Sequence, residues 1–524
     1  MRVGPLPQTI HIIFLTHFSV ASIAQKSISG IGFDTLASKN TTLKKIFVNS
    51  IQGEFNRNSA HPINTLSRAE ILKSGQNTII ESLSQKPGMD IISTGGIGKP
   101  VIRGLSFNKV ALYSMGTKIE SQQWDDDHDV GISEAGIEKA EIVLGPAAVI
   151  YGADAVGGSI IFIDEKNSPP GKTLGNINLG LYSNTRGINI GAGIKHSFSS
   201  GDYLNAFFNG QSHMDYRQGR QKVDPANPFA INSRYNNISG KLRTGLVRKW
   251  GSSRICYSYL RSLSGLVVGE DENSILIVQG KAFNSNERKL NAPYFDVTTQ
   301  VISSENTLLS GKGKFYLNVS YQSNKRDEYI IGEGADHQRH TLGLLLNTFN
   351  YESRFTSSEE RHAGITIGIQ GFAQLNKNYG AVIATPDAMI NNIGMYGLIH
   401  LNYGKWKFQT GLRLDTRNIS VAKPTRDYED ETTLDSLEKE ALRMIGLKRN
   451  VSDFNNHYFP VNFSAEAVYH CSTKLTCKAN ISTGFTAPNF AELATFWKHE
   501  GTSRFEIGNP NLKPQKNIEG DIYI

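Results

Sequence analysis

The feature that most constrains the fold is a series of segments after Pro170 in which apolar and polar residues alternate. Residues 176–182 and 314–321 are clear examples. Alternation with a period of two places successive side chains on opposite faces of a β-strand. Strands of about ten residues can cross an outer membrane with one face against lipid and the other facing a wet lumen. The pattern therefore predicts a mainly β protein with a transmembrane antiparallel β-barrel.

The connections between these segments alternate in length. Tight turns are expected at residues 199–202, 250–253, 309–313, 356–361, 403–405 and 472–474, and longer connections at 214–236, 264–296, 324–338, 375–391, 416–457 and 486–513. About fourteen strands can be laid out in this way, with short turns on one rim and long loops on the other, as outer-membrane barrels have them. A soluble sandwich or propeller is the alternative, but no blade motif repeats and the loops are not short at both ends. The barrel is predicted over residues 166–524.

The preceding residues, 60–165, have a mixed texture that predicts a compact α/β domain. An amphipathic stretch follows Ser67, and Glu70 stands three residues later, which is the spacing of a helix capping box. Short apolar strands are expected near Val101 and near Val110. The sequence therefore predicts at least two folding units, this domain followed by the barrel.

The first 24 residues have the three parts of a secretory signal peptide: Arg2 near the start, an apolar stretch over residues 10–20, and small residues up to Ala24. The mature chain is expected to begin near Gln25, and residues 25–59 form a polar, irregular segment. A short membrane anchor or buried helix is the alternative, but the apolar stretch is too short to span a bilayer. The signal predicts export.

The net charge of +7 does not indicate nucleic acid as a partner, because lysine and arginine are scattered among acidic residues. The chain has three cysteines; Cys256 stands alone, while Cys471 and Cys477 flank a short turn. A disulfide between the last two and a pair of free thiols both remain open. The chain contains no nucleophile–base arrangement, phosphate loop or nucleotide fingerprint, so an enzyme with a catalytic cofactor is not expected.

Four motifs carry a resemblance to a known family. They are residues 87–90 (Pro-Gly-Met-Asp), residues 100–105 with Arg103 and Gly104, residues 141–161 with Gly145, Pro146, Tyr151, Gly152, Gly157 and Gly158, and the late motif Asn509, Pro510, Asn511 and Leu512. In order and spacing they resemble the plug and late barrel of TonB-dependent receptors. The resemblance implies a plug domain inside an outer-membrane barrel, active transport, and the periplasmic protein TonB as energy-coupling partner. Glycines in the third motif are expected where the plug packs against the barrel wall, because a side chain there would clash.

The short β-like island Lys45, Ile46, Phe47 and Val48 lies where the family places its TonB box. Such a box is an exposed segment that adds as a strand to the edge of its periplasmic partner. An ordinary linker is the alternative reading of this island.

Two features depart from the family pattern. Leu144 stands where the family usually has Arg or Lys, which puts one charge contact between plug and barrel in doubt. The family's barrel has 22 strands, so about eight strands are expected beyond Ile524, and that residue lacks the aromatic ring that usually ends such barrels. The sequence therefore predicts a truncated barrel of about 14 of the 22 strands. A non-functional remnant is one reading of this truncation.

The ligand prediction rests on an acidic plug loop, residues 122–129, and on a distant histidine. The loop resembles that of the branch of the family that takes up zinc or haem, and residue-by-residue matching gives Asp127, His128 and His499 as metal ligands. Imidazole and carboxylate together suit zinc. The loop could equally be a solvated acidic face, and a ferric siderophore or haem is the alternative ligand. A passive porin would lack the plug motifs, and an adhesin would carry external repeats.

Overall fold

The computed structural model describes residues 63–94, 96–121, 130–144, 148–152, 154–219, 228–267, 286–331, 338–357, 362–424, 453–472, 475–499 and 504–524. The chain divides into two compact units, Met1–Phe47 and Val48–Ile524, and all described residues lie in the second. The predicted signal peptide, TonB box and acidic plug loop, together with Gly145 and Pro146, lie outside the described residues.

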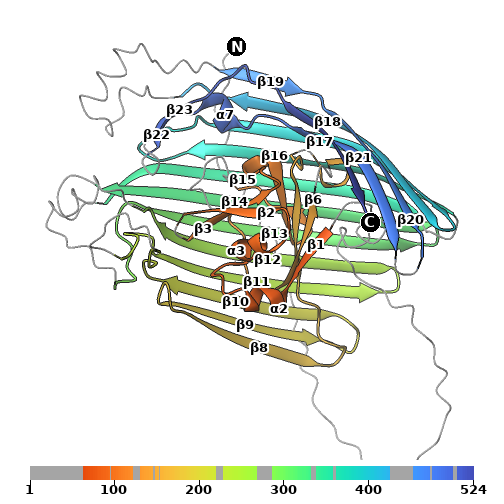
Figure 1. Cartoon of the computed structure of the whole chain (residues 1–524), viewed down its shortest axis with the longest axis horizontal. Coiled ribbons are helices and arrows are strands. Elements are labelled where there is room, and N and C mark those ends of the chain that lie inside the picture. The colour runs from red at the N-terminus through yellow and green to blue at the C-terminus, as the bar shows by residue number, and fades with distance from the viewer. Residues whose placement is uncertain are drawn as a thin grey trace, which may run out of the picture. The chain divides into compact units, whose positions relative to one another are not determined.

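The first part of the described chain forms the predicted α/β domain, here called the plug (Figure 1). Its elements are β1 (Ile63–Ser67), α2 (Arg68–Lys73), α3 (Ile79–Ser82), β2 (Met89–Thr94), β3 (Ile97–Ile102), β4 (Val110–Ser114), β5 (Thr117–Lys118), β6 (Ile137–Leu144), α4 (Ala148–Tyr151) and β7 (Gly158–Asp164). A five-stranded sheet has the order β1-β6-β7-β4-β5, and β2 and β3 form a separate hairpin. The expected capping box is present: the Ser67 side chain accepts from the Glu70 N–H, and the Glu70 carboxylate accepts from the Ser67 N–H.

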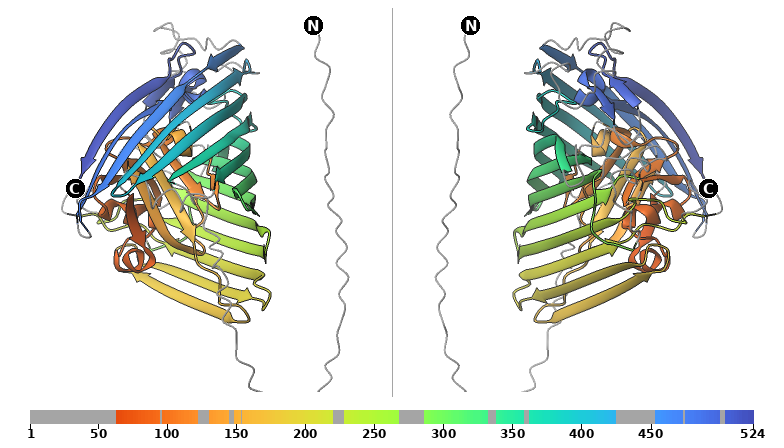
Figure 2. Two further views of the ribbon diagram at one scale, coloured as in Figure 1. Left: turned by 90° about the vertical axis from the view of Figure 1, so that its right-hand side faces the viewer. Right: turned by 90° about the vertical axis from the view of Figure 1, so that its left-hand side faces the viewer.

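The second part forms one antiparallel sheet of 15 strands. The strands are β8 (Thr173–Tyr182), β9 (Gly187–Ser197), β10 (Tyr203–His213), β11 (Tyr235–Arg248), β12 (Gly251–Gly265), β13 (Tyr294–Ser310), β14 (Gly313–Ile331), β15 (Gln338–Ser357), β16 (Ala363–Asn378), β17 (Ala388–Tyr403), β18 (Trp406–Val421), β19 (Phe454–Tyr458), β20 (Val461–His470), β21 (Thr476–Thr486) and β24 (Gln515–Tyr523). Fourteen of them pair in sequence order from β8 to β24, as the alternation predicts, and β19 and β20 pair with successive stretches of β18. Figure 2 shows the sheet curving around the plug.

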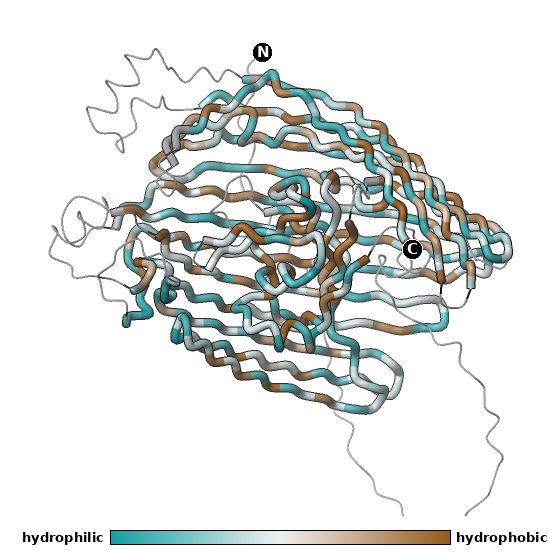
Figure 3. Tube along the Cα trace, viewed as in Figure 1, coloured by the Kyte–Doolittle hydropathy of each residue, from teal (hydrophilic) through white to brown (hydrophobic). Residues whose placement is uncertain are grey.

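The two faces of the sheet differ in chemistry, as the period of two predicts. On β18, Leu412 and Leu414 point outward with 52% and 42% of their surface exposed, whereas Arg413 and Asp415 point inward and are buried. The same change of hydropathy from residue to residue runs along the other strands (Figure 3). An apolar outer face and a polar inner face suit lipid outside and a plug-filled lumen inside. Among the described residues, no helix is long and apolar enough to cross a membrane.

The sheet has the two rims that the turn pattern predicts. Within the described residues, the connections β11–β12, β13–β14 and β17–β18 span only a few residues, while those after β10, β12 and β21 are long. The two edge strands, β8 and β24, each pair on one side only in the described part of the chain. At the short-turn rim, the Sγ atoms of Cys471 and Cys477 lie 3.4 Å apart as thiols.

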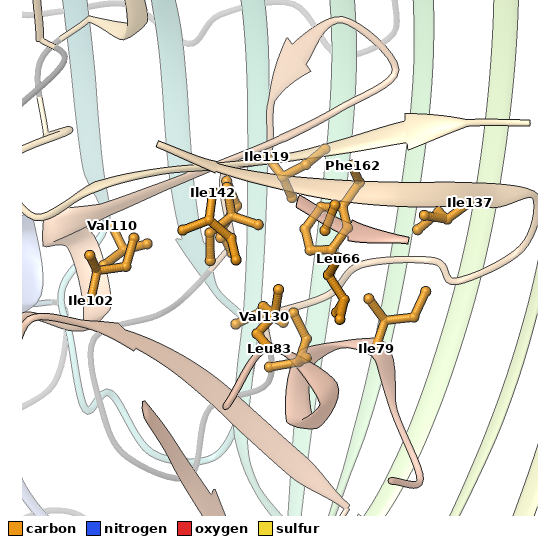
Figure 4. Close-up of a cluster of buried hydrophobic side chains, with 14 of the residues drawn as sticks. Leu66, Ile79, Leu83, Ile102, Val110, Ile119, Val130, Ile137, Ile142 and Phe162 are labelled. Carbon is orange, nitrogen blue, oxygen red and sulfur yellow. The ribbon is translucent and has the colours of Figure 1, made fainter. Parts of the chain in front are cut away.

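The plug has its own hydrophobic core beneath its sheet (Figure 4). Leu66, Leu83, Ile102, Ile137 and Ile142 are all fully buried in it. Burying such side chains is worth roughly 1.5–3 kcal/mol each, so this core holds the plug's shape. The plug can therefore present fixed charged groups to the barrel wall.

Candidate functional site at the plug and barrel wall

The plug and the barrel wall line a cavity of about 80 Å³ toward the long-loop rim, here called the outer cavity. Its wall residues Gln374, Ile390 and Arg417 lie near the long-loop ends of β16, β17 and β18. Its plug residues include Glu120 and Ser121. Ser121 directly precedes residues 122–129, so the predicted ligand-binding loop starts at this cavity.

A second cavity, of about 40 Å³, lies toward the short-turn rim and is here called the inner cavity. Its wall residues come from the middle of the strands and include Ser303, Tyr351, Gln370 and Arg413. A water molecule needs about 10–15 Å³ of such space. The inner cavity therefore has room for a few water molecules and excludes a larger solute while the plug is in this position.

A compact group of charges lies between these cavities. The plug residue Asp154 accepts two hydrogen bonds from the Arg417 guanidinium, at 2.9 and 2.8 Å, and one from Lys118 Nζ at 3.2 Å. Thr486 Oγ1 donates to the same carboxylate at 3.2 Å. Lys118 also pairs with Glu120 at 2.7 Å. Two-point pairing between arginine and carboxylate fixes the geometry as well as the charge.

The pKa values of the plug members of this group follow from its partners. Burial alone would raise the pKa of Asp154, but Arg417 and Lys118 lower that pKa to about 2. Burial would lower the pKa of Lys118, yet the neighbouring Glu120 and Asp154 charges raise it. Both side chains are therefore held in their charged forms at neutral pH.

Two more sets of ion pairs join the plug to the wall. Asp164 pairs with Lys241 at 2.7 Å and with Arg243 at 3.3 Å, both on β11. On the edge strand β24, Arg103 contacts three side chains: Glu519, Asp521 at 3.2 Å and Tyr523 at 3.0 Å. Leu144, by contrast, is buried in the plug core. The charge contact that the resemblance placed in doubt at Leu144 is therefore replaced by apolar packing.

The sequence predicts that the glycines of the motif at residues 141–161 lie where the plug packs against the barrel wall, and this is correct for only one of the two glycines considered next. A Cβ atom on Gly152, whose φ is +82°, would come within 3.1 Å of Gln370 on the wall, so this glycine allows close plug–wall contact. A Cβ atom on Gly157 would instead meet Leu105 at 2.9 Å and the Lys109 carbonyl at 3.2 Å, both inside the plug. The wall-contact explanation for Gly157 is therefore wrong, because its close neighbours belong to the plug.

The late-barrel motif lies against β19. The Pro510 carbonyl accepts from Asn456 Nδ2 at 2.9 Å, and the Leu512 carbonyl accepts from the Tyr458 hydroxyl at 3.4 Å. The Asn509 N–H donates to the carbonyl of Glu492 at 2.9 Å, in the helix α7 (Phe490–Ala494). These contacts anchor the long connection between β21 and β24 at the outer rim.

Of the three predicted metal ligands, the structure describes only the backbone of His499. Asp127 and His128 lie outside the described residues. The backbone of His499 ends strand β22 (Phe496–His499), which pairs with β23 (Arg504–Ile507), but its side chain is not described. No cluster of three metal-ligating side chains occurs among the residues that are described. The metal site therefore stays a prediction.

The comparison with known proteins now adds to this geometry. Residues 56–159 match the family described as the TonB-dependent receptor plug domain, and residues 171–522 match the TonB-dependent receptor-like β-barrel. The chain belongs to the TonB-dependent receptor family. Receptors of this family are outer-membrane β-barrel proteins of Gram-negative bacteria and are not enzymes, so the predicted location and the absence of a catalytic role are confirmed.

Curated relatives in this family are distant in sequence. The vitamin B12 transporter BtuB of Photobacterium profundum is 20% identical over 89% of this chain and 64% of its own length. The iron-regulated outer membrane virulence protein of Vibrio cholerae is 20% identical over 100% of this chain and 70% of its own length. The chain thus spans about two thirds of the length of these relatives.

Solved structures share the fold. The copper transporter OprC superposes with a TM-score of 0.65 at 14% identity, over 84% of this chain and 65% of that protein. The hemophore receptor HasR of Serratia marcescens superposes with a TM-score of 0.67 at 13% identity, over 90% of this chain and 70% of that protein. At these identities the likeness is one of fold.

The charged group around Asp154 was not found from the sequence. One signal was present: Arg413, Asp415 and Arg417 recur at every second residue of β18, which places three charges on the face of the strand that points into the lumen. Buried charges need partners. Arg417 finds its partner, Asp154, on the plug, whereas Arg413 and Asp415 pair with each other on the wall.

Proposed function

We propose that this chain contributes to TonB-dependent active transport of a scarce metal or metal complex across the outer membrane. The observation that carries the proposal is the position of the plug, which fills the curved sheet and leaves a cavity on the long-loop side. A ligand arriving from outside would reach this cavity first. Further passage would require the plug to move, because the inner cavity has room only for water.

The class of ligand is inferred from relatives and from chemistry. The relatives and solved structures named above are described as handling vitamin B12, copper and heme. Asp127 and His128 belong to the segment that follows Ser121 at the outer cavity, and His499 ends a strand in the long connection after β21. One carboxylate and two imidazoles suit a divalent metal such as zinc and leave a position for a further ligand. A ferric siderophore or haem is the second candidate, supported by the iron-regulated relative.

The energy for transport is proposed to come from TonB through the segment Lys45, Ile46, Phe47 and Val48. This segment precedes the plug, and its β-like character would let it add as a strand to the edge of a periplasmic partner. Outer-membrane lipid would contact the apolar outer face of the strands.

The test measures uptake by the full chain in a Gram-negative host that lacks its own zinc, haem and vitamin B12 receptors. Radioactive zinc, haemin and cyanocobalamin are supplied separately, each with and without the host's TonB protein. We expect TonB-dependent accumulation of one probe, with zinc first. Deletion of residues 45–48 should abolish uptake and leave binding of that probe intact.

The proposed ligands are tested by titrating zinc into the purified protein and into its His128→Ala variant. Weaker binding by the variant would support the site, with His196→Ala, a change on a strand far from residues 122–129 in sequence, as control. Equal binding by the variant and the unchanged chain would remove His128 from the ligand set. Uptake of all three probes without TonB would contradict the transport proposal itself.

A further inference from the structure

The outer and inner cavities meet at three residues. Lys118, Phe372 and Arg417 each line both cavities, and the carboxylate of Asp154 lies on the outer side, bonded to both cations. The Phe372 ring lies 5.7 Å from Lys118 Nζ and 5.3 Å from the Arg417 guanidinium carbon, measured to the ring centroid. These four residues separate the two cavities and are here called the partition. Phe372 and Arg417 belong to the barrel, and Lys118 and Asp154 belong to the plug.

The partition is built to stay closed at rest. Lys118 and Asp154 are plug residues with little exposed surface, and Arg417 is held in place on the wall by Asn392, whose Oδ1 accepts from Nε at 3.0 Å. The backbone of Asp154 has a φ of +77°, a conformation that is uncommon for residues other than glycine. Its N–H donates to the Phe485 carbonyl on β21 at 2.9 Å, so wall contacts hold this strained residue from both ends.

The cavities lie one behind the other along the same side of the lumen. The outer cavity touches the long-loop ends of β16, β17 and β18, and the inner cavity touches the middle of those strands and extends to β13 and β14. The two cavities therefore share a boundary, and the ion pair between Asp154 and Arg417 lies at that boundary.

We propose that Asp154, Lys118, Arg417 and Phe372 form a gate between the two cavities, and that the ligand's route follows the wall formed by β14 to β18. The route rests on the proposed transport function, whereas the closed gate is a property of the resting protein. Opening separates Asp154 from Arg417 and draws Lys118, which lies on the plug, away from the wall. With Glu120 included, the closed gate has two charges of each sign and no net charge, and opening leaves Arg417 on the wall without its carboxylate partner.

A native reporter lies behind the gate. Cys256 on β12 is buried, and its Sγ lies 3.1 Å from Met115 Sδ, a plug atom whose residue lines the inner cavity. Its register partner on β13, Ser303, lines the same cavity. With Cys471 and Cys477 changed to Ser, Cys256 is the only one of the chain's three cysteines left, so a thiol reagent reports access to this region.

The test follows the rate at which a small neutral reagent, methyl methanethiosulfonate, labels Cys256 in the folded full chain, without ligand and without TonB. Heat-modifiable migration in gels confirms that each variant is folded. We expect Asp154→Asn and Arg417→Gln each to speed labelling about tenfold, which corresponds to about 1.4 kcal/mol. The double variant should be no faster than either single variant, because both changes break the same contact. Should Asp154→Asn fail to fold, Lys118→Gln tests the same gate.

The matched control is Glu165→Gln. Glu165 is also a buried plug carboxylate, and it pairs with Lys195 on β9 at 2.7 Å, away from the gate. The gate predicts an unchanged rate for this control. Equal acceleration by Glu165→Gln and Asp154→Asn would show that the whole plug loosens, and it would overturn the gate. Additive effects in the double variant, or labelling of Asp154→Asn at the unchanged rate, would overturn it as well. None of these outcomes depends on ligand or TonB, so failure of the transport proposal would be seen separately.

Discussion

Two buried carboxylic acids at the plug–wall contact have pKa values that are shifted in opposite directions. Asp154 has two cations beside it, and its pKa is lowered to about 2 in spite of burial. Glu134 accepts from the Ile79 N–H at 2.7 Å and from Gln211 Nε2 on β10 at 3.0 Å, both neutral donors. Burial, helped by the nearby Glu81 charge, raises the pKa of Glu134 to about 7. The comparison shows that the partners of a buried acid, rather than its depth, decide its charge at neutral pH.

The difference suggests two tasks. The charged Asp154 makes a strong but separable contact, which suits a position that has to open. Glu134 bonds the first turn of α3 to the wall, and its raised pKa of about 7 leaves it partly protonated at neutral pH, which suits packing against neutral donors. The Glu134 contact with β10 is therefore expected to stay in place when the Asp154 contact with β18 opens.

The largest effect is expected from Arg417→Leu. This change leaves Asp154 buried with Lys118 as its remaining cation, and removing one partner of a buried ion pair costs about 3–5 kcal/mol. Urea unfolding of the protein in detergent micelles should show a loss in this range. The control is Arg261→Leu, which removes an exposed ion pair with Asp296 at 2.7 Å and should cost much less. Equal losses would mean that burial does not strengthen the Asp154 contact.

The next effect is a pH dependence with opposite signs at the two acids. The pKa of Glu134 is raised, so the folded state resists its ionisation, and stability falls as pH rises from about 4.5 to about 7. The fall is up to about 3 kcal/mol, and Glu134→Gln should remove it. Among the described residues, Gln211 Oε1 has no hydrogen-bond partner, so it could accept from the amide that this change introduces.

The sign reverses at Asp154. Its pKa is lowered, so its contribution is fully present above about pH 4 and is lost as the pH falls toward 2, by about 2 kcal/mol. Unfolding curves of Glu134→Gln and Asp154→Asn, measured between pH 2 and 8, separate the loss of stability toward high pH, which is due to Glu134, from the loss toward low pH, which is due to Asp154. If Glu134→Gln followed the unchanged chain through pH 7, the proposed difference between the two acids would be lost.

Much of the fold could be predicted from the sequence because its signals are local. The period of two shows in every strand by itself, and tight turns and long connections can be read in order, so the fourteen paired strands agree with the prediction. The capping box needs only Ser67 and Glu70, three residues apart. Each of these patterns is settled within about ten residues of chain.

The gate could not be predicted in this way. Asp154 and Arg417 are separated by 263 residues, and only the tertiary structure shows that their side chains form an ion pair. The motif around Gly157 was found from the sequence, but whether its neighbours belong to the wall or to the plug depends on the tertiary packing. Leu144 could be recognised as a departure from the family pattern, whereas its place in the plug core could not.

The smallest effect is expected at Arg103, the exposed counterpart of the buried pair at Asp154. Its side chain is 35% exposed and contacts Glu519 and Asp521 on β24. Exposed ion pairs are worth about 0.2–1 kcal/mol, because water screens the charges and ordering the side chains costs entropy. Arg103→Gln should therefore lower the urea midpoint only slightly, and the change should shrink further in about 1 M salt, where the screening length is about 3 Å.

Gln is the informative replacement at this position. The backbone φ of Arg103 is +48°, so Gly would also relieve backbone strain and Pro could not adopt the conformation. Gln removes the guanidinium, with its charge and its hydrogen bonds, and leaves the backbone requirement unchanged. Arg248→Gln serves as control, since Arg248 pairs with Asp202 at a barrel turn and is similarly exposed. Comparable, salt-sensitive losses in both variants are expected. A salt-independent loss of several kcal/mol at Arg103 alone would show that its contact with β24 is as deeply protected as that of Asp154, and the contrast between an exposed and a buried plug contact would fail.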